Sequence, residues 1–155
     1  MFRLIIFLFI CVSSVNAITL TQTVASDVLF DLTPVAPTDA GDYFNNSYTR
    51  DLTALTIDDI PSNQKWKVYA KISNYVHSGS EKIKIKVKRN GNGTGVTTPS
   101  GGATYKKLNI TSYKYLFRGK GNRFDIPMTT KITNIGVTDD YGTFNTTIEY
   151  KVETY

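Results

Sequence analysis

The stretch WKVYAKI, residues 66–72, alternates apolar and polar side chains along its whole length. Successive side chains of an extended chain point to opposite faces of a sheet. One face of this stretch consists of Trp66, Val68, Ala70 and Ile72, and the other of Lys67, Tyr69 and Lys71. The period of two therefore predicts a strand with one buried face and one solvent face.

Similar runs, rich in β-branched and aromatic residues, recur along the rest of the chain. Gly, Asn, Asp, Pro and Ser cluster between the runs, and no window has the apolar spacing of an amphipathic helix. The pattern predicts an all-β protein, an antiparallel, immunoglobulin-like β-sandwich of seven to nine strands with almost no helix. An eight-stranded barrel is the competing architecture. The expected strands cover residues 18–24, 52–57, 66–72, 82–88, 104–110, 113–117, 124–135 and 142–155.

The run KIKIKVK, residues 82–88, carries a lysine at every second position. If residues 73–81 close a hairpin between this run and WKVYAKI, the lysines of both strands share one solvent face. Directly opposed like charges destabilise a sheet, so we expect acids alongside, and Glu149 and Glu153 of the last strand are the candidates. The candidate binding residues of this basic face are Lys67, Tyr69, Lys71, Lys82, Lys84, Lys86 and Lys88.

Two roles are open for these lysines. A basic face suits phosphate-bearing or uronic polymers at a cell surface. Lysines on an exposed strand also prevent sheets from pairing edge to edge, and the sequence alone favours this second role. Nucleic acid is not expected as a partner, because Tyr69 is the one aromatic residue interleaved with the lysines.

The first 17 residues, MFRLIIFLFICVSSVNA, have the composition of a signal peptide. One arginine precedes a short apolar run, which small and polar residues follow. Cleavage is expected between Ala17 and Ile18, and it would remove Cys11, the single cysteine. We therefore expect residues 18–155 to form one β-sandwich domain without a disulfide, secreted or displayed at the cell surface, with no membrane span after cleavage.

The chain has few residues that could act as a catalytic nucleophile, acid or base. His77 is the single histidine and lies in a polar turn, and no nucleophile motif such as G-x-S-x-G is present. The adjacent pairs Asp58-Asp59 and Asp139-Asp140 are expected in turns, since neighbouring residues on a strand face opposite ways. We therefore expect no enzyme activity and no cofactor.

The remaining polar motifs are weak as ligand sites. NGNGTG, residues 90–95, lacks the ending of a phosphate-binding loop and is expected to be a flexible connection. RGKGNR, residues 118–123, is a weak candidate for anion contact through Arg118, Lys120 and Arg123. No metal site is expected, because the oxygen-rich residues lack calcium-loop spacing: Asp39, Asp42, Asn45 and Asn46. Four Asn-x-Ser/Thr triplets, at Asn45, Asn92, Asn109 and Asn145, would be glycan acceptors in a eukaryotic secretory pathway. Chance occurrence in a chain rich in Asn and Thr is the favoured explanation.

The segment GTFNTTIEYKVETY, residues 142–155, resembles the closing strand of chaperone–usher pilins and related spore-coat-like fimbrial subunits. In that family a glycine stands fourteen residues from the end, and an aromatic residue and alternating apolar residues follow it. Thr154 stands where the family has its penultimate aromatic residue. The positions that match the family pattern are Gly142, Phe144, Ile148, Tyr150 and Val152.

The resemblance to pilins implies an incomplete sheet, which a chaperone and then the N-terminal strand of a neighbouring subunit would complete. ITLTQTVASDVLF, residues 18–30, has Ile18, Leu20, Gln22 and Val24 in one phase and could act as such a donor strand. A longer part of the chain, from WKVYAKI to DIPM, resembles a family of uncharacterised bacterial secreted proteins. No activity is known for that family, so the resemblance does not indicate one here. If residues 18–24 pair within their own chain, the donor-strand hypothesis loses its basis.

Two classes of function follow from the sequence. The first is a non-enzymatic structural or adhesive protein of the cell surface, which would join copies of itself or related subunits by strand pairing. The second is a self-contained secreted binding module for carbohydrate or for an anionic surface polymer. Completeness of the sandwich distinguishes the two.

Overall fold

The computed structural model of the 155-residue chain describes residues 18–24, 48–76, 84–134 and 145–155. These residues form ten β-strands and no helix, so the predicted all-β class is confirmed. The strands are β1 (Thr19–Val24), β2 (Tyr48–Asp58), β3 (Lys65–Val76), β4 (Lys84–Arg89), β5 (Thr94–Gly95), β6 (Ser100–Gly101), β7 (Lys106–Lys107), β8 (Lys114–Lys120), β9 (Arg123–Thr133) and β10 (Asn145–Thr154).

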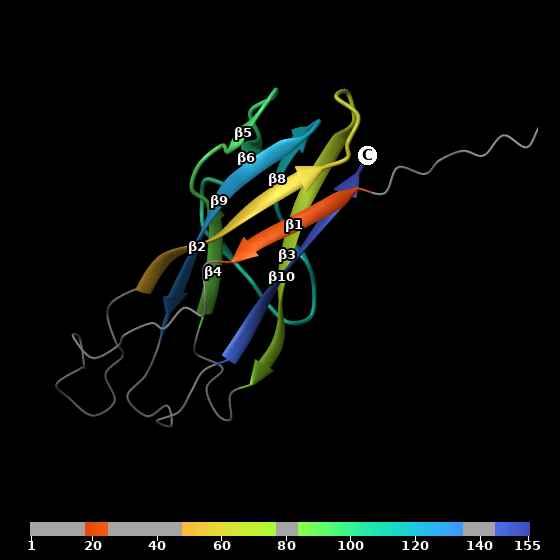
Figure 1. Cartoon of the computed structure of the whole chain (residues 1–155). Coiled ribbons are helices and arrows are strands. Elements are labelled where there is room, and N and C mark those ends of the chain that lie inside the picture. Colours follow the sequence, from red (N-terminus) through yellow and green to blue (C-terminus); the bar gives the residue numbers. More distant parts are fainter. Residues whose placement is uncertain (1–17, 25–47, 77–83, 135–144) are drawn as a thin grey trace, which may run out of the picture.

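The strands form two antiparallel sheets that pack face to face, which is the predicted sandwich (Figure 1). The large sheet has the order β1-β2-β9-β4-β7, with β5 also paired to β9. The small sheet has the order β10-β3-β8-β6. In Figure 1, β1 of the large sheet crosses in front of β3 and β10 of the small sheet.

Consecutive long strands alternate between the two sheets after β2. β3, β8 and β10 belong to the small sheet, whereas β4 and β9 belong to the large sheet. The predicted hairpin between residues 66–72 and 82–88 is therefore wrong, because β3 pairs with β10 and β8, and β4 pairs with β9 and β7. Two strands with one apolar face each can bury those faces side by side or across the core. Here they do so across the core.

The core is formed by the residues that the alternating pattern assigns to the inner face. Its largest side chain is Trp66, whose indole nitrogen donates a hydrogen bond to the carbonyl of Gly121 at 2.7 Å. The Trp66 ring meets that of Phe117 edge to face, with centroids 6.1 Å apart. Burying one such side chain stabilises the fold by roughly 1.5–3 kcal/mol. The inner faces of β3 and β4 supply Trp66, Val68, Ala70, Ile72, Ile85 and Val87.

The first and last described strands, β1 and β10, are edge strands of the two sheets. β1 pairs with β2 of its own chain, from Thr19 opposite Asp58 to Val24 opposite Thr53. Residues 19–24 are therefore paired with a strand of their own chain. Gly142 and Phe144 of the expected closing strand lie outside the described residues. The apolar side chains that pack against the core here are Ile18, which directly precedes β1, Leu20 of β1, and Ile148, Tyr150 and Val152 of β10.

A buried arginine holds the glycine-rich loop that follows β4. The Arg123 side chain, from a residue that is 4 % exposed, donates to the carbonyls of Asn92 at 2.6 Å, Gly95 at 2.8 Å and Gly93 at 2.9 Å. The loop lies so close to β9 that a Cβ at Gly93 would come within 2.2 Å of the Phe124 carbonyl oxygen. The loop is therefore anchored rather than a free connection. Arg123 is also not an anion contact, because its guanidinium is buried against carbonyl oxygens.

Candidate functional site

The outer face of the large sheet gathers lysines from three strands. Lysines on β4 alternate with the buried residues Ile85 and Val87, so they point outward. Lys86 lies opposite Lys131 of β9 on one side and opposite Lys107 of β7 on the other. We name the resulting group the lysine face, and its members are Lys84, Lys86, Lys88, Lys107 and Lys131.

The charge on the lysine face is concentrated and of one sign. The Cβ atoms of directly opposed residues in an antiparallel pair lie about 5 Å apart, and alternate residues along a strand lie about 7 Å apart. Lys107, Lys86 and Lys131 therefore form a row across β7, β4 and β9. Both ion pairs of the described residues are on the small sheet, so none of these lysines has a carboxylate partner within that part of the chain.

Tyr105 is the aromatic member of this surface. The ammonium groups of Lys88 and Lys131 lie over its ring, 5.0 and 5.4 Å from the centroid, and the negative π face attracts both. Thr129 of β9 has Asp51 of β2 opposite it on one side and Lys88 of β4 opposite it on the other. The Asp51 carboxylate accepts hydrogen bonds from the Thr129 hydroxyl and the Asn90 amide, which are neutral donors and leave its negative charge in place. Among the described residues the five lysines outnumber this one nearby carboxylate, so the face has a net positive charge.

The outer face of the small sheet combines lysines with acids. Lys71 of β3 lies opposite Glu149 of β10, and Lys67 lies opposite Glu153. The Lys71 and Glu149 side chains form an ion pair at 3.1 Å, as the sequence analysis expects. Glu153 pairs instead with Lys151 of its own strand, at 2.6 Å. We name this surface the tyrosine face, and its members are Lys67, Tyr69, Lys71, Tyr113, Tyr115, Glu149, Lys151 and Glu153.

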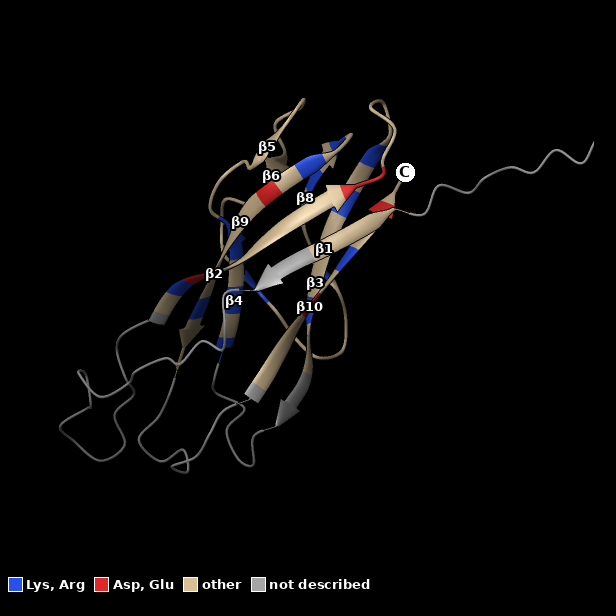
Figure 2. Ribbon diagram, viewed as in Figure 1, with Lys and Arg blue, Asp and Glu red and all other residues tan. Residues whose placement is uncertain are grey.

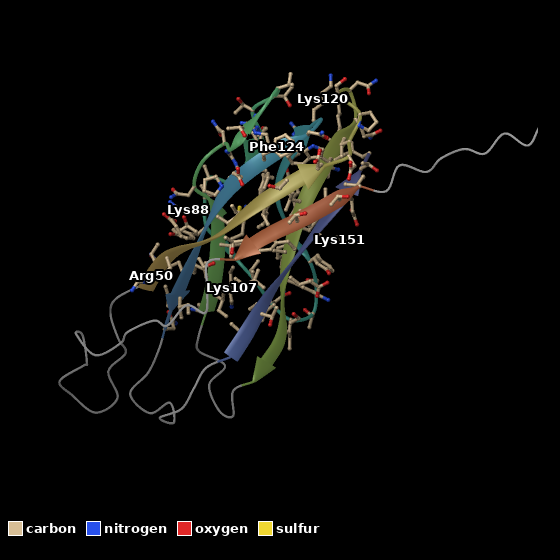
Figure 3. The ribbon with its side chains drawn as sticks, in the orientation of Figure 1. Arg50, Lys88, Lys107, Lys120, Phe124 and Lys151 are labelled. Atoms are coloured by element: carbon tan, nitrogen blue, oxygen red, sulfur yellow. The ribbon has the colours of Figure 1, made fainter. Side chains whose placement is uncertain are left out.

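The single basic face expected from the sequence is thus divided between the two sheets. The lysines of β3 and β4 point away from each other, because these strands belong to opposite layers of the sandwich. Figure 2 shows Lys and Arg segments on both layers, including a series along β4. Lys88 and Lys151 lie on opposite sides of the molecule in Figure 3. The expected residues Ala17 and Lys82 lie outside the described part of the chain.

A third cationic group lies at the glycine-rich loop. Arg89 donates to the carbonyls of Gly91 at 2.7 Å and Gly101 at 3.0 Å, and also to the side chain of Asn92. Desolvation, and then the nearby charge of Arg123, lower the pKa of the Arg89 guanidinium. These arginines are held by carbonyl oxygens of the loop, so their role is structural.

The sequence matches no family model and no curated protein. Within residues 18–24, 48–76, 84–134 and 145–155, no helix has the length and hydrophobicity to cross a membrane. In the same residues no three His, Cys, Asp or Glu side chains gather in a metal-binding group. His77 and the oxygen-rich residues near 39–46 lie outside these ranges. The assignment of a function therefore depends on the chemistry of the two outer faces.

Proposed function

We propose that the protein is a non-enzymatic, self-contained binding module that adheres to an anionic polymer of the cell surface through its lysine face. The observation that carries the proposal is the row of Lys107, Lys86 and Lys131, which stand on adjacent strands without a carboxylate partner among the described residues. Like charges placed directly opposite each other destabilise a sheet. A bound polyanion would remove that repulsion from all three lysines together.

The chemistry of the lysine face suits a ligand that accepts hydrogen bonds and carries repeated negative charge. A lysine ammonium group has three donors and no acceptor, so it complements phosphate, sulfate or carboxylate oxygens. The side chains of Lys84, Lys86 and Lys88 are partly covered, so their stems pack on the sheet while their head groups reach solvent. A polymer that contacts several lysines gains further affinity by releasing its condensed counterions.

Two further observations support a module of this kind. β1 pairs with β2 along six registered positions, so the N-terminal strand has a partner within its own chain. The composition of residues 1–17 supports export, which would bring the lysine face into contact with surface polymers.

A structural role through strand pairing is the second candidate. It is favoured by the position of β1 and β10 at the edges of their sheets, where backbone groups are open to another chain. Size-exclusion chromatography of residues 18–155 distinguishes the two roles. The binding module predicts a monomer, and the structural role predicts stable oligomers that survive dilution.

The direct test of anion binding is a triple variant, Lys86→Ala/Lys107→Ala/Lys131→Ala, measured by titration calorimetry with heparin and with polyphosphate. We expect affinity to fall by about tenfold or more, and the slope of log K against log salt to fall by about three. The matched control is Lys65→Ala/Lys114→Ala/Lys120→Ala, which removes the same net charge from exposed lysines elsewhere. An equal loss in both variants would mean that net charge alone drives binding, and the proposal would fail.

A further inference from the structure

The tyrosine face presents aromatic rings toward solvent. Tyr69 of β3 lies opposite Tyr115 of β8, and their rings meet edge to face with centroids 5.8 Å apart. The ammonium groups of Lys71 and Lys151 lie over the ring of Tyr113, at 4.7 and 5.4 Å from its centroid. Tyr115 is 42 % exposed, so its ring offers contact area to a ligand.

Hydrogen-bond donors and acceptors surround these rings in close alternation. Glu149 accepts a hydrogen bond from the Tyr113 hydroxyl and pairs with Lys71 at 3.1 Å. A hydrogen bond from Lys151 lowers the pKa of Glu153, so this carboxylate is an acceptor at neutral pH. Desolvation and the neighbouring Glu153 raise the pKa of Tyr69, so its hydroxyl stays protonated and can donate.

The two outer faces therefore differ in the ligand chemistry that they offer. The lysine face offers charged donors, and the tyrosine face offers donors, acceptors and exposed rings. A sugar hydroxyl both donates and accepts, and the C–H side of a pyranose ring packs against the electron-rich face of an aromatic ring. Glu149 and Glu153 would repel an anionic polymer.

We propose that the tyrosine face binds a neutral oligosaccharide, with Tyr69 and Tyr115 as the stacking rings and with Lys71 and Glu149 as a donor–acceptor pair for its hydroxyl groups. This site is independent of the anion-binding site, since the two lie on opposite layers of the sandwich and share no residue. Binding to the tyrosine face should therefore be insensitive to salt, whereas binding to the lysine face is weakened by it.

The test uses a set of neutral hexasaccharides as probes: cellohexaose, xylohexaose, chitohexaose, mannohexaose and maltohexaose. Titration calorimetry in about 0.5 M sodium chloride suppresses the contribution of the lysine face. We expect at least one probe to bind the wild-type protein. Tyr115→Ala should weaken that binding by about tenfold, because it removes a stacking ring, whereas Tyr115→Phe retains the ring and most of the affinity.

Tyr105→Ala is the matched control, because it removes a tyrosine that lies beside the lysine face, under Lys88 and Lys131, and it should leave oligosaccharide affinity unchanged. Urea denaturation of each variant establishes that it is folded. If Tyr115→Ala is not folded, Tyr115→Gln takes its place, because it also removes the ring but keeps a longer polar side chain, and the same tenfold loss is expected. Failure of all five probes to bind, or equal losses in Tyr105→Ala and Tyr115→Ala, would overturn the proposal. Retained heparin binding in that case would leave the anion-binding proposal standing, so the two failures are distinguishable.

Discussion

The lysine face and the tyrosine face are built from the same alternating pattern, yet they differ in what lies opposite each lysine. On β4, Lys86 has a lysine on both sides. On β3, Lys71 faces Glu149, and Lys67 has Glu153 of β10 on one side and Arg118 of β8 on the other. Alternation decides which residues reach the surface, whereas strand order decides which charges meet there. The neighbouring strand therefore leaves lysine opposite lysine on one face and places acids opposite lysines on the other, and we propose that the first of these faces binds anions.

The largest expected change comes from removing the acids that distinguish the tyrosine face. In Glu149→Gln/Glu153→Gln, the small sheet keeps Lys67, Lys71 and Lys151 without a carboxylate among them. We expect this variant to gain a second polyanion site, so that heparin stoichiometry in calorimetry rises from one site to two. The cause is the loss of both ion pairs and of the repulsion that the two acids exert on an anion.

The matched control for the gained site is Asp58→Asn/Asp59→Asn, which makes the same change in net charge at the turn after β2. Asp59 has a positive φ of 59°, a conformation that asparagine also accepts. Stoichiometry should stay at one in this control. A stoichiometry of one in both variants would contradict the account of why the two faces differ.

A smaller effect is expected on stability, with opposite signs on the two faces. Lys86→Gln relieves repulsion from two neighbours, and we expect it to stabilise the fold by about 0.2–1 kcal/mol at low salt. Lys71→Gln removes the ion pair with Glu149, which is 42 % exposed, and should destabilise by less than about 1 kcal/mol. Urea denaturation in low and high salt measures both, and changes of the same sign in low salt would contradict the comparison.

Most of the fold could be predicted from the sequence, because successive side chains of a strand point alternately to the core and to solvent, and the apolar and polar residues alternate in the same way. The long strands were located by runs such as WKVYAKI, and β3 spans Lys65–Val76 around it. The sequence predicts a full strand over residues 104–110. In the structure the strand is limited to Lys106 and Lys107, which pair with Val87 and Lys86 of β4. The two-residue strands β5 and β6 lack the length to produce any periodic signal.

The candidate site could be predicted only in part, because its charges come from strands far apart in the sequence. Lys84, Lys86 and Lys88 follow from one run, but nothing in that run indicates Lys107 or Lys131 as neighbours. The sequence predicts the lysines of β3 beside those of β4, since strands adjacent in sequence are the usual hairpin partners. Glu149 was found correctly, because the last strand carries acids on its outer face whichever strand it joins.

The most direct test of the central claim is to map polyanion binding onto the two faces by NMR. Backbone amide shifts of ¹⁵N-labelled protein would be followed during titration with a heparin hexasaccharide at low salt. If the lysine face binds the polyanion, shift changes will be concentrated on β4, β7 and the Lys131 region of β9, and β3 and β10 will be unaffected. Changes centred on β3 and β10, or spread evenly over both sheets, would contradict that claim.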